Sequence, residues 1–496
     1  MTTVDDIIRA APAELCRPWL RYILHHQEWT ALAQAAAAEA RVLLAHWADT
    51  IQAHALFLDP AALSIVAVST PLEAGCYPAL SPFLPAAAWF ERMIHDLWGH
   101  LAIGATDLRP WLDHGHWLQS HPMATRPEPP VRPAMPDTAE PDDVMVLPLG
   151  PIWGLCDEAA HLRLTLNGPT ILHAEVRLGF THKGTLALMR GKSPRAAARF
   201  VARLSADSTI AHSLAFARAA EAAMEVQAPP RAEGLRIIMM EIERIAGHLD
   251  NLAEVARLAY AEPLRTRCGL LRETLLRASD AAFGHRLMMD CVIPGGVAVD
   301  IAQGGPQVIL RALGDIASHL SGIRRLHDAP AMASRLVGLG RIGGTFAASL
   351  GVGGVVGRAS GYSFDARMAF VSGYGSLAPR VAVRPDGDAA ARQYIRIFEI
   401  EESLRLIGAA LDLLPPGPVT VALPLVSGEA IACAESIRGD VWHWLRLDHG
   451  QIAAVFPRDP GWALWNLAER VLENASVEDI DLIRASLALP ASGMDL

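Results

Sequence analysis

The chain has 496 residues, of which 51% are hydrophobic and 19% charged, and its formal net charge is −10. This length predicts more than one domain. The negative charge excludes the basic footprint of a nucleic-acid-binding protein, so no nucleic-acid partner is expected. The longest weakly polar run, residues 336–357, is glycine-rich and carries Arg341, which favours a buried loop-and-helix region over a membrane span.

The N-terminus and the cysteines indicate the compartment. The opening segment MTTVDDIIRAAPAELC begins acidic and lacks the basic-then-apolar order of a signal peptide. The six cysteines are scattered, and none forms a C-x-x-C pair. This pattern predicts a reduced, cytoplasmic chain that holds no iron–sulfur cluster of its own.

Three segments of the N-terminal region carry clear local patterns. Residues 28–48 are alanine-rich and predict a helix. Residues 62–70 predict a strand, and residues 85–104 predict a helix opened by Pro85. A proline-dense stretch without apolar periodicity follows, which predicts an extended linker. We therefore place the domains at 1–120 and 148–496, joined by a linker at 121–147.

The second domain reads as mainly helical. Residues 161–179 alternate around Asn167-Gly168, as in a hairpin. Residues 234–260 repeat apolar side chains three and four apart, as a core helix does. Further predicted elements are helices within 184–290, 300–335 and 388–412, a strand at 418–425, and a turn at Pro294-Gly295-Gly296.

Specific motifs carry a family resemblance. The segment YPALSPFLPAAAWFERMIHDLWGHLAIGATDLRPWL (77–112) resembles the signature of the small hydrophilic, 30-kDa subunit of respiratory complex I. The rest resembles the quinone-site, 49-kDa subunit and the large subunits of group-4 nickel–iron hydrogenases. The motifs are GPIWGLCDEAAHLRL (150–164), GFTHKG (179–184), MEIERIAGHL (240–249), GHRLMMDCVIPGGVAVD (284–300), RASGYSFDAR (358–367), GDAAARQYIRIFEIEES (387–403) and ESIRGDVWHWL (435–445).

The fusion of both parts is similar to formate-hydrogenlyase and hydrogenase-4 large subunits. The resemblance implies an α+β fold. A small N-terminal α/β domain would precede a mainly α-helical domain with small β-sheets.

The metal-binding cysteines of that family are replaced. The form R-x-C-x-x-C-x-x-x-H reads R-x-S-x-x-S-x-x-x-H here, so Ser205 and Ser208 stand at the first pair. The second pair falls on Pro490 and Gly493. A hydroxyl is a hard ligand that stays protonated near neutral pH, whereas such metals prefer thiolates. The resemblance therefore predicts a hydrogenase-like subunit without a bound metal.

The residues that bind the quinone headgroup in the 49-kDa subunit of complex I are also replaced. Its two loop histidines correspond to Trp153 and Asp157, and its tyrosine corresponds to Ala206. On the same loop, Glu158 matches a proton-relay glutamate of the hydrogenases best, with Asp157 beside it. The alternative is a solvated turn or a backbone cap.

Three residues are implied to face an iron–sulfur cluster of a partner subunit: His182, Lys183 and Arg203. Lys183 keeps the charge of the family's arginine but lacks the planar guanidinium group, which can donate two parallel hydrogen bonds. The alternative for His182 is a structural hydrogen bond. His212 reads as a packed helix histidine. Ser205 and Ser208 could form a small polar pocket or cap a helix start.

Five charged residues look like a structural ion-pair network behind the site: Asp365, Arg367, Asp388, Arg392 and Arg396. The family resemblance implies partners: an iron–sulfur small subunit and antiporter-like membrane subunits. It predicts a large hydrophilic subunit of a membrane-associated respiratory complex, peripheral on the inner face of the cell membrane. Electron transfer coupled to ion translocation is the implied role, and no cofactor is expected on this chain.

Two other functions stay open. One is a non-catalytic scaffold that docks the small subunit, and the other is a quinone or small-molecule oxidoreductase with a non-standard site. Whether the chain is itself an enzyme is therefore undecided. A NAD site is not expected, because no strand–GxGxxG–helix fingerprint occurs.

Overall fold

The N-terminal part of the chain is an α/β unit. The computed structural model describes residues 2–127, 129, 144–153, 159–371, 373–490 and 492–496. The five-stranded sheet of the N-terminal unit has the order β1-β2-β5-β4-β3. Its neighbouring strands are antiparallel except β2 and β5, which are parallel. The elements are α1 (Val4–Ala10), β1 (Ala13–Cys16), β2 (Trp19–Ile23), α2 (His26–Ala38), β3 (Val42–Ala48), β4 (Gln52–Asp59), β5 (Ser64–Pro71), β6 (Cys76–Pro78), η1 (Pro85–Ala87), α3 (Ala88–Trp98) and β7 (Leu101–Ile103).

Two predicted helices of this unit are shorter than their sequences indicated. The helix predicted over 28–48 ends at Ala38, and Ala40 turns the chain at φ 53° into strand β3. Pairing of β3 with β4 outweighs the local helix propensity there. The helix predicted over 85–104 spans η1 and α3 and stops at Gly99, whose φ is 75°. Strand β5 confirms the strand predicted at 62–70.

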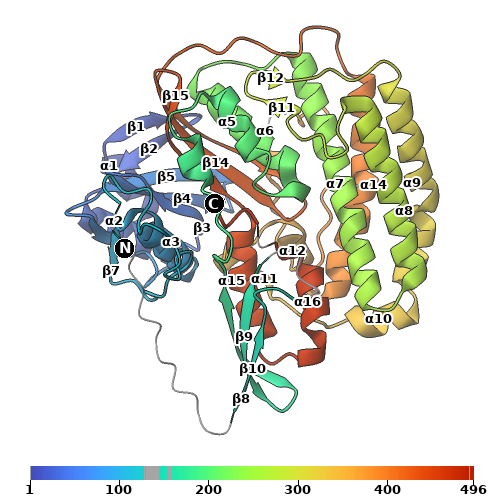
Figure 1. The fold of residues 1–496 in the computed structure, drawn as a ribbon, viewed down its shortest axis with the longest axis horizontal. Helices are drawn as coiled ribbons and strands as arrows, with labels where there is room; N and C mark the ends of the chain where they lie inside the picture. Colours follow the sequence, from blue (N-terminus) through green and yellow to red (C-terminus); the bar gives the residue numbers. More distant parts are fainter. Residues whose placement is uncertain (1, 128, 130–143, 154–158, 372, 491) are drawn as a thin grey trace.

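A three-stranded antiparallel sheet opens the second part. It contains β8 (Met145–Leu149), β9 (His161–Asn167) and β10 (Thr170–Arg177), in the order β10-β9-β8. The predicted turn at Asn167-Gly168 joins β9 to β10, and Gly168 has a φ of 57°. Figure 1 shows this sheet projecting from the body. Residues 128 and 130–143 of the predicted linker lie outside the described residues.

The helical body is built around α7, which packs against α8 and α14 (Figure 1). The elements of this region are α4 (Thr185–Met189), α5 (Pro194–Val201), η2 (Ala206–Ser208), α6 (Thr209–Ala223), α7 (Pro230–Leu258), α8 (Glu262–Phe283), β11 (Val292–Ile293), β12 (Gly296–Val297), α9 (Gly305–His327), α10 (Pro330–Leu336), α11 (Gly344–Ser349), α12 (Gly354–Ala359), α13 (Ala366–Ala369) and α14 (Ala389–Asp412). The long helix predicted at 234–260 is thus α7, and the predicted turn at 294–296 joins β11 to β12.

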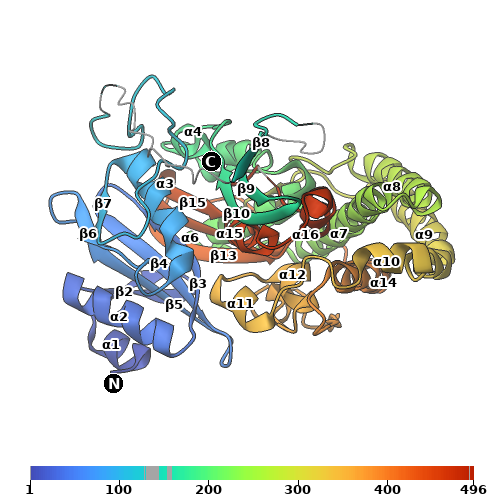
Figure 2. The same cartoon turned by 90° about the horizontal axis from the view of Figure 1, so that it is seen from below.

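A central sheet, β13-β14-β15, lies between the N-terminal unit and the long helices (Figure 2). It consists of β13 (Gly428–Glu435), β14 (Asp440–Asp448) and β15 (Gln451–Arg458), with α6 packed against β13 and β14. The strand predicted at 418–425 is wrong, because this segment forms only a bridge between Thr420 and Gly296. Pro418 and Pro424 lack the N–H groups that a strand interior needs.

The C-terminal segment returns into the interior. After α15 (Gly461–Leu472), η3 (Val477–Asp479) and α16 (Ile480–Leu487), the chain runs inward to Leu496. Leu496 is buried, and its carbonyl oxygen accepts the Thr185 backbone N–H at 2.8 Å. None of the helices in the described part of the chain has the length and apolar character needed to cross a membrane.

Candidate functional site

The former metal-ligand positions converge between η2 and the C-terminal segment. Ser205 precedes η2, and Ser208 is its last residue; both side chains are buried. The Ser492 hydroxyl lies 3.5 Å from the Ser205 hydroxyl and so joins the two halves of the motif. We call this region the remodelled metal pocket. The fold therefore retains the arrangement in which two distant segments meet.

An ion pair between Asp207 and Arg438 stands in this pocket. Arg438, from the β13–β14 turn, donates two hydrogen bonds to the Asp207 carboxylate, one of them at 2.7 Å to Oδ1. The hydroxyls of Ser205 and Ser208 donate to the same oxygen at 2.9 and 3.4 Å. Burial opposes ionisation, but Arg438 and Ser205 outweigh it and lower the pKa of Asp207 to about 2.

The second pair of positions is blocked by packing. Gly493 has a φ of +87°, and a Cβ atom there would come within 2.7 Å of the Asp459 side chain. The Asp459 carboxylate lies 3.0 Å from Nε2 of His212, which is fully buried on α6. The carbonyl oxygen of Pro490 accepts a hydrogen bond from the Trp465 indole. His212 is thus placed as a packed helix histidine with a carboxylate partner.

These groups do not fit a nickel–iron centre. Such a centre needs soft thiolate donors, whereas the pocket presents hydroxyls, a carboxylate already paired with arginine, and backbone groups. Across the described residues, no cluster of three or more histidine, cysteine, aspartate or glutamate side chains is arranged to hold a metal ion.

Neither serine caps the helix that follows. Glu243 of α7 does so instead, because its carboxylate accepts the backbone N–H groups of Ile210 at 2.6 Å and Ala211 at 3.1 Å. Burial raises the pKa of Glu243 to about 8, the N–H groups oppose this, and nearby Asp207 adds to it. Sequence reasoning missed this residue, although it lies in the family motif MEIERIAGHL.

The three predicted cluster-facing residues lie near one another. The Lys183 ammonium donates to the Leu204 carbonyl at 2.8 Å, next to Arg203, and lies 3.1 Å from the Asp495 carboxylate. The His182 Nδ1 bonds the Asp495 carbonyl at 2.7 Å. Burial lowers the pKa of His182, and that hydrogen bond opposes the shift. The exposed Arg203 guanidinium holds Asp290 through two bonds of 2.7 and 2.8 Å.

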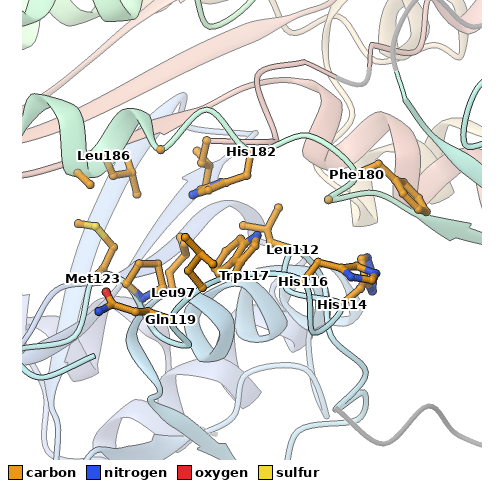
Figure 3. A pocket seen from close by; sticks show the side chains of 16 residues that line it. Leu97, Leu112, His114, His116, Trp117, Gln119, Met123, Phe180, His182 and Leu186 are labelled. Atoms are coloured by element: carbon orange, nitrogen blue, oxygen red, sulfur yellow. The ribbon is translucent and has the colours of Figure 1, made fainter. Parts of the chain in front are cut away.

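A cleft of about 930 Å³ has His182 in its wall. Its walls come from α3, residues 112–123, residues 179–187 and Leu496, so both parts of the chain contribute. Figure 3 shows Trp117 and His182 facing each other across it, and their ring centroids are 4.7 Å apart. The lining is mainly apolar, which suits a hydrophobic occupant.

Other predicted site residues stand apart. Asp157 and Glu158 lie outside the described residues, so their proton-relay role stays a prediction. Trp153 packs partly buried against the core, and Ala206 is exposed on η2.

The predicted ion-pair network needs revision. Asp365 and Arg367 form a buried pair at 2.7 Å. Asp388 instead caps α14, accepting from the Ala391 backbone N–H. Arg392 donates to the Ser486 hydroxyl and to backbone carbonyls, and Arg396 lies 3.3 Å from the His248 ring nitrogen.

Comparisons with known proteins agree with this architecture. Residues 13–129 match the 30-kDa subunit family of respiratory-chain NADH dehydrogenase, and residues 267–427 match the 49-kDa subunit family. Formate hydrogenlyase subunit 5 of Escherichia coli is 29% identical over 439 residues, which are 83% of this chain and 75% of that protein. The membrane-bound hydrogenase subunit alpha of Pyrococcus furiosus is 28% identical over 366 residues, 69% of this chain and 85% of that protein.

A solved structure shares the fold. A chain of the membrane-bound sulfane sulfur reductase, an archaeal respiratory membrane complex, superposes with a TM-score of 0.68 and 24% identity, covering 72% of this chain and 100% of that one. The chain thus carries a part similar to the complex I 30-kDa subunit followed by a part similar to the 49-kDa subunit, and it is a homologue of hydrogenase large subunits of the group-4 type.

Proposed function

We propose that this chain is the large peripheral subunit of a membrane-associated respiratory complex. It takes part in electron transfer coupled to ion translocation without a nickel–iron centre. The observation that carries the proposal is the remodelled metal pocket, where the Asp207–Arg438 pair stands within an otherwise retained fold. Relatives named as hydrogenase and formate hydrogenlyase subunits support the membrane-complex role.

The partners in this proposal are an iron–sulfur small subunit and antiporter-like membrane subunits, on the inner face of the cell membrane. The chain binds no cofactor of its own. His182, Lys183 and Arg203 support a docking face for the small subunit, because His182 lines the cleft, Lys183 follows it in the chain, and the Lys183 ammonium bonds the Leu204 carbonyl next to Arg203. Exposed apolar side chains beside it, such as Leu118 at 92% and Phe180 at 43% exposure, suit burial under a partner.

Metal content of the purified complex tests the proposal. A tag on this chain isolates the complex from its native membranes, and nickel and iron are measured by mass spectrometry. We expect iron from the partner's clusters and less than stoichiometric nickel, because the pocket offers no thiolates. Stoichiometric nickel, or a chain that purifies without any iron–sulfur partner, contradicts the proposal.

The same preparation separates electron transfer from a scaffold role. Arg203→Gln removes a cation from the proposed cluster-facing surface and leaves Asp290 unpaired, which should lower the midpoint potential of the nearest cluster. Arg277→Gln, an exposed change on α8, is the control. Unchanged potentials and turnover in Arg203→Gln favour the scaffold.

The quinone alternative has one observation in its favour, the size of the cleft. Its volume of about 930 Å³ falls in the range of small-molecule sites. The cavity beside Asp207 and Glu243, at about 30 Å³, cannot hold a quinone headgroup. A photoreactive quinone analogue that labels Trp117 or His182 in the intact complex would favour this alternative.

A further inference from the structure

Glu243 is a buried carboxyl with an unusual set of neighbours. Each of its oxygens accepts one backbone N–H from the first turn of α6. An ionised carboxylate oxygen has a second acceptor site, so each oxygen can still take a proton or a water. The residue is 8% exposed, yet it is not sealed in an apolar core, because it lines a small cavity.

That cavity connects Glu243 to Asp207 and to the surface between α7 and α8. Its volume of about 30 Å³ is enough for a water molecule. Asp207 lines it, and so do three charged residues. Asp250 is exposed and pairs at 3.3 Å with the half-buried Arg272, and the exposed Arg286 pairs with Glu273 at 2.8 Å.

Burial and nearby polar groups together set the protonation of Glu243. Burial raises its pKa most, the Ile210 and Ala211 N–H groups lower it, Asp207 of η2 raises it further, and Arg244 on the same helix lowers it. Arg438 lies beyond Asp207 and is engaged by that carboxylate. Asp250, Arg272 and Arg286 face it across the cavity. Glu243 therefore titrates close to neutral pH, while Asp207 stays ionised.

We propose that Glu243 is a proton-exchange site that links the α7–α8 surface to the remodelled metal pocket. A proton enters from solvent through water in the cavity and binds a Glu243 oxygen. Release returns the carboxylate and passes the same proton to water beside Asp207. Inward of Asp207, hydroxyls continue the polar path through Ser205 to Ser492. Each passage moves one proton and no electrons.

Proton exchange at Glu243 does not require electron transfer by this chain. Only the use that the complex makes of these protons rests on the proposed function. Protons delivered to the remodelled metal pocket would compensate a change of charge in that pocket. The test below measures protonation alone, so the proposed function can fail on metal or cluster evidence without affecting it.

Infrared difference spectra of the purified complex on either side of pH 8 test the proposal. We expect one component of the carbonyl stretch of protonated carboxyls to disappear with a midpoint at about pH 8, above the components of Glu435 and Glu469, whose pKa values burial raises to about 7. Glu243→Gln should remove the band with the midpoint at about pH 8. The control Glu254→Gln, on the same helix beside Arg257, should keep it, because Arg257 already lowers the pKa of Glu254. A band that survives in Glu243→Gln overturns the proposal, as does its absence from the unaltered complex.

Two further variants keep the test valid if Glu243→Gln does not fold. Asp207→Asn should move the midpoint of the band to lower pH, because a negative charge that raises the pKa is removed. Ala206→Leu covers the cavity from η2 and should leave the band in place but slow its shift after transfer to heavy water. An unchanged midpoint in the first variant or an unchanged exchange rate in the second contradicts the proposed route.

Discussion

At the residue scale, the Asp207 carboxylate accepts hydrogen bonds from two distant parts of the chain. Arg438 reaches it from the β13–β14 turn, and Ser205 and Ser208 reach it from either side. Arg438 also donates to the Ala488 carbonyl at 2.6 Å. The C-terminal segment is thus held to the start of α6 by charge and hydrogen bonds.

Removing the carboxylate charge should loosen this junction. In Asp207→Asn, Arg438 loses its ionic partner. We expect the free energy of unfolding to fall by about 1–2 kcal/mol, a modest amount because solvent partly screens the pair. Differential scanning fluorimetry of the full chain measures the loss. The control Asp290→Asn breaks an exposed pair and should cost less than about 1 kcal/mol.

The effect of Asp207 should depend on pH. The pKa of this carboxyl is lower in the folded chain, at about 2, than the value of about 3.9 expected when unfolded. Its contribution is therefore present above about pH 4 and is lost as the pH falls toward 2. The difference in thermal midpoint between the two chains should be constant near neutrality and shrink in acid. A constant difference at all pH values would assign the effect to packing.

The site was only partly visible in the sequence. Ser205, Ser208, Pro490 and Gly493 could be found because a motif fixes their spacing. Arg438 and Glu243 could not be assigned, because their partners Asp207 and Ile210 are far away in sequence and only the fold brings them together. A spacing pattern reports local geometry, and these contacts are not local.

At the element scale, Arg358 ties α12 to α14, to the loop before α13 and to β13. Its buried guanidinium lies 2.7 Å from Glu399, 2.8 Å from Glu435 and 3.4 Å from Asp365. Arg244 of α7 joins Glu399 at 3.2 Å. These carboxylates come from three separate elements, so one arginine joins all of them to α12.

Replacing Arg358 should therefore be costly. Arg358→Met leaves three buried carboxylates without their shared cation, and we expect at least about 3–5 kcal/mol of destabilisation. Soluble yield and the thermal midpoint report it. Arg380→Met removes an exposed arginine from Glu402 and should change stability by less than about 1 kcal/mol. Equal effects of the two changes would contradict a special role for the buried network.

Elements with a clear apolar period were the ones that could be predicted. The alternation of β9, which buries one face, and the three-and-four apolar spacing of the central helix α7 were both correct. Strand β14 is buried on both faces, so it shows no alternation and was missed. The helix predicted over 28–48 failed for a related reason, since β3 is buried along its whole length and its sequence does not separate strand from helix.

At the scale of the whole molecule, the two predicted domains share one packed interior. Arg21 of β2 donates to Glu429 of β13 at 2.7 Å, and Arg17 bridges to Ala430. The Trp47 ring stacks on Phe456 with centroids 5.6 Å apart. The predicted boundary at 121–147 thus marks a break in sequence pattern, while the packing continues across it.

The interface should hold without the connecting chain. A protease site inserted within residues 130–143 should yield two pieces that co-elute in gel filtration, because buried aromatic contacts join them. Trp47→Ala removes a buried ring and should cost about 3–5 kcal/mol, so the cut pieces should separate at lower denaturant concentration. Leu118→Ala, at 92% exposure, is the matched control. Pieces that separate without denaturant would show two independent domains.

The backbone at Gly493 leaves no room for a side chain beside Asp459. Its left-handed φ of +87° disfavours any side chain, and a Cβ atom would displace Asp459 from beside His212. Four substitutions that restored cysteines would therefore still meet a closed space, with Arg438 held by Asp207 in it. A thiolate site at these positions would therefore need coordinated changes at charged and backbone positions as well as the four cysteines.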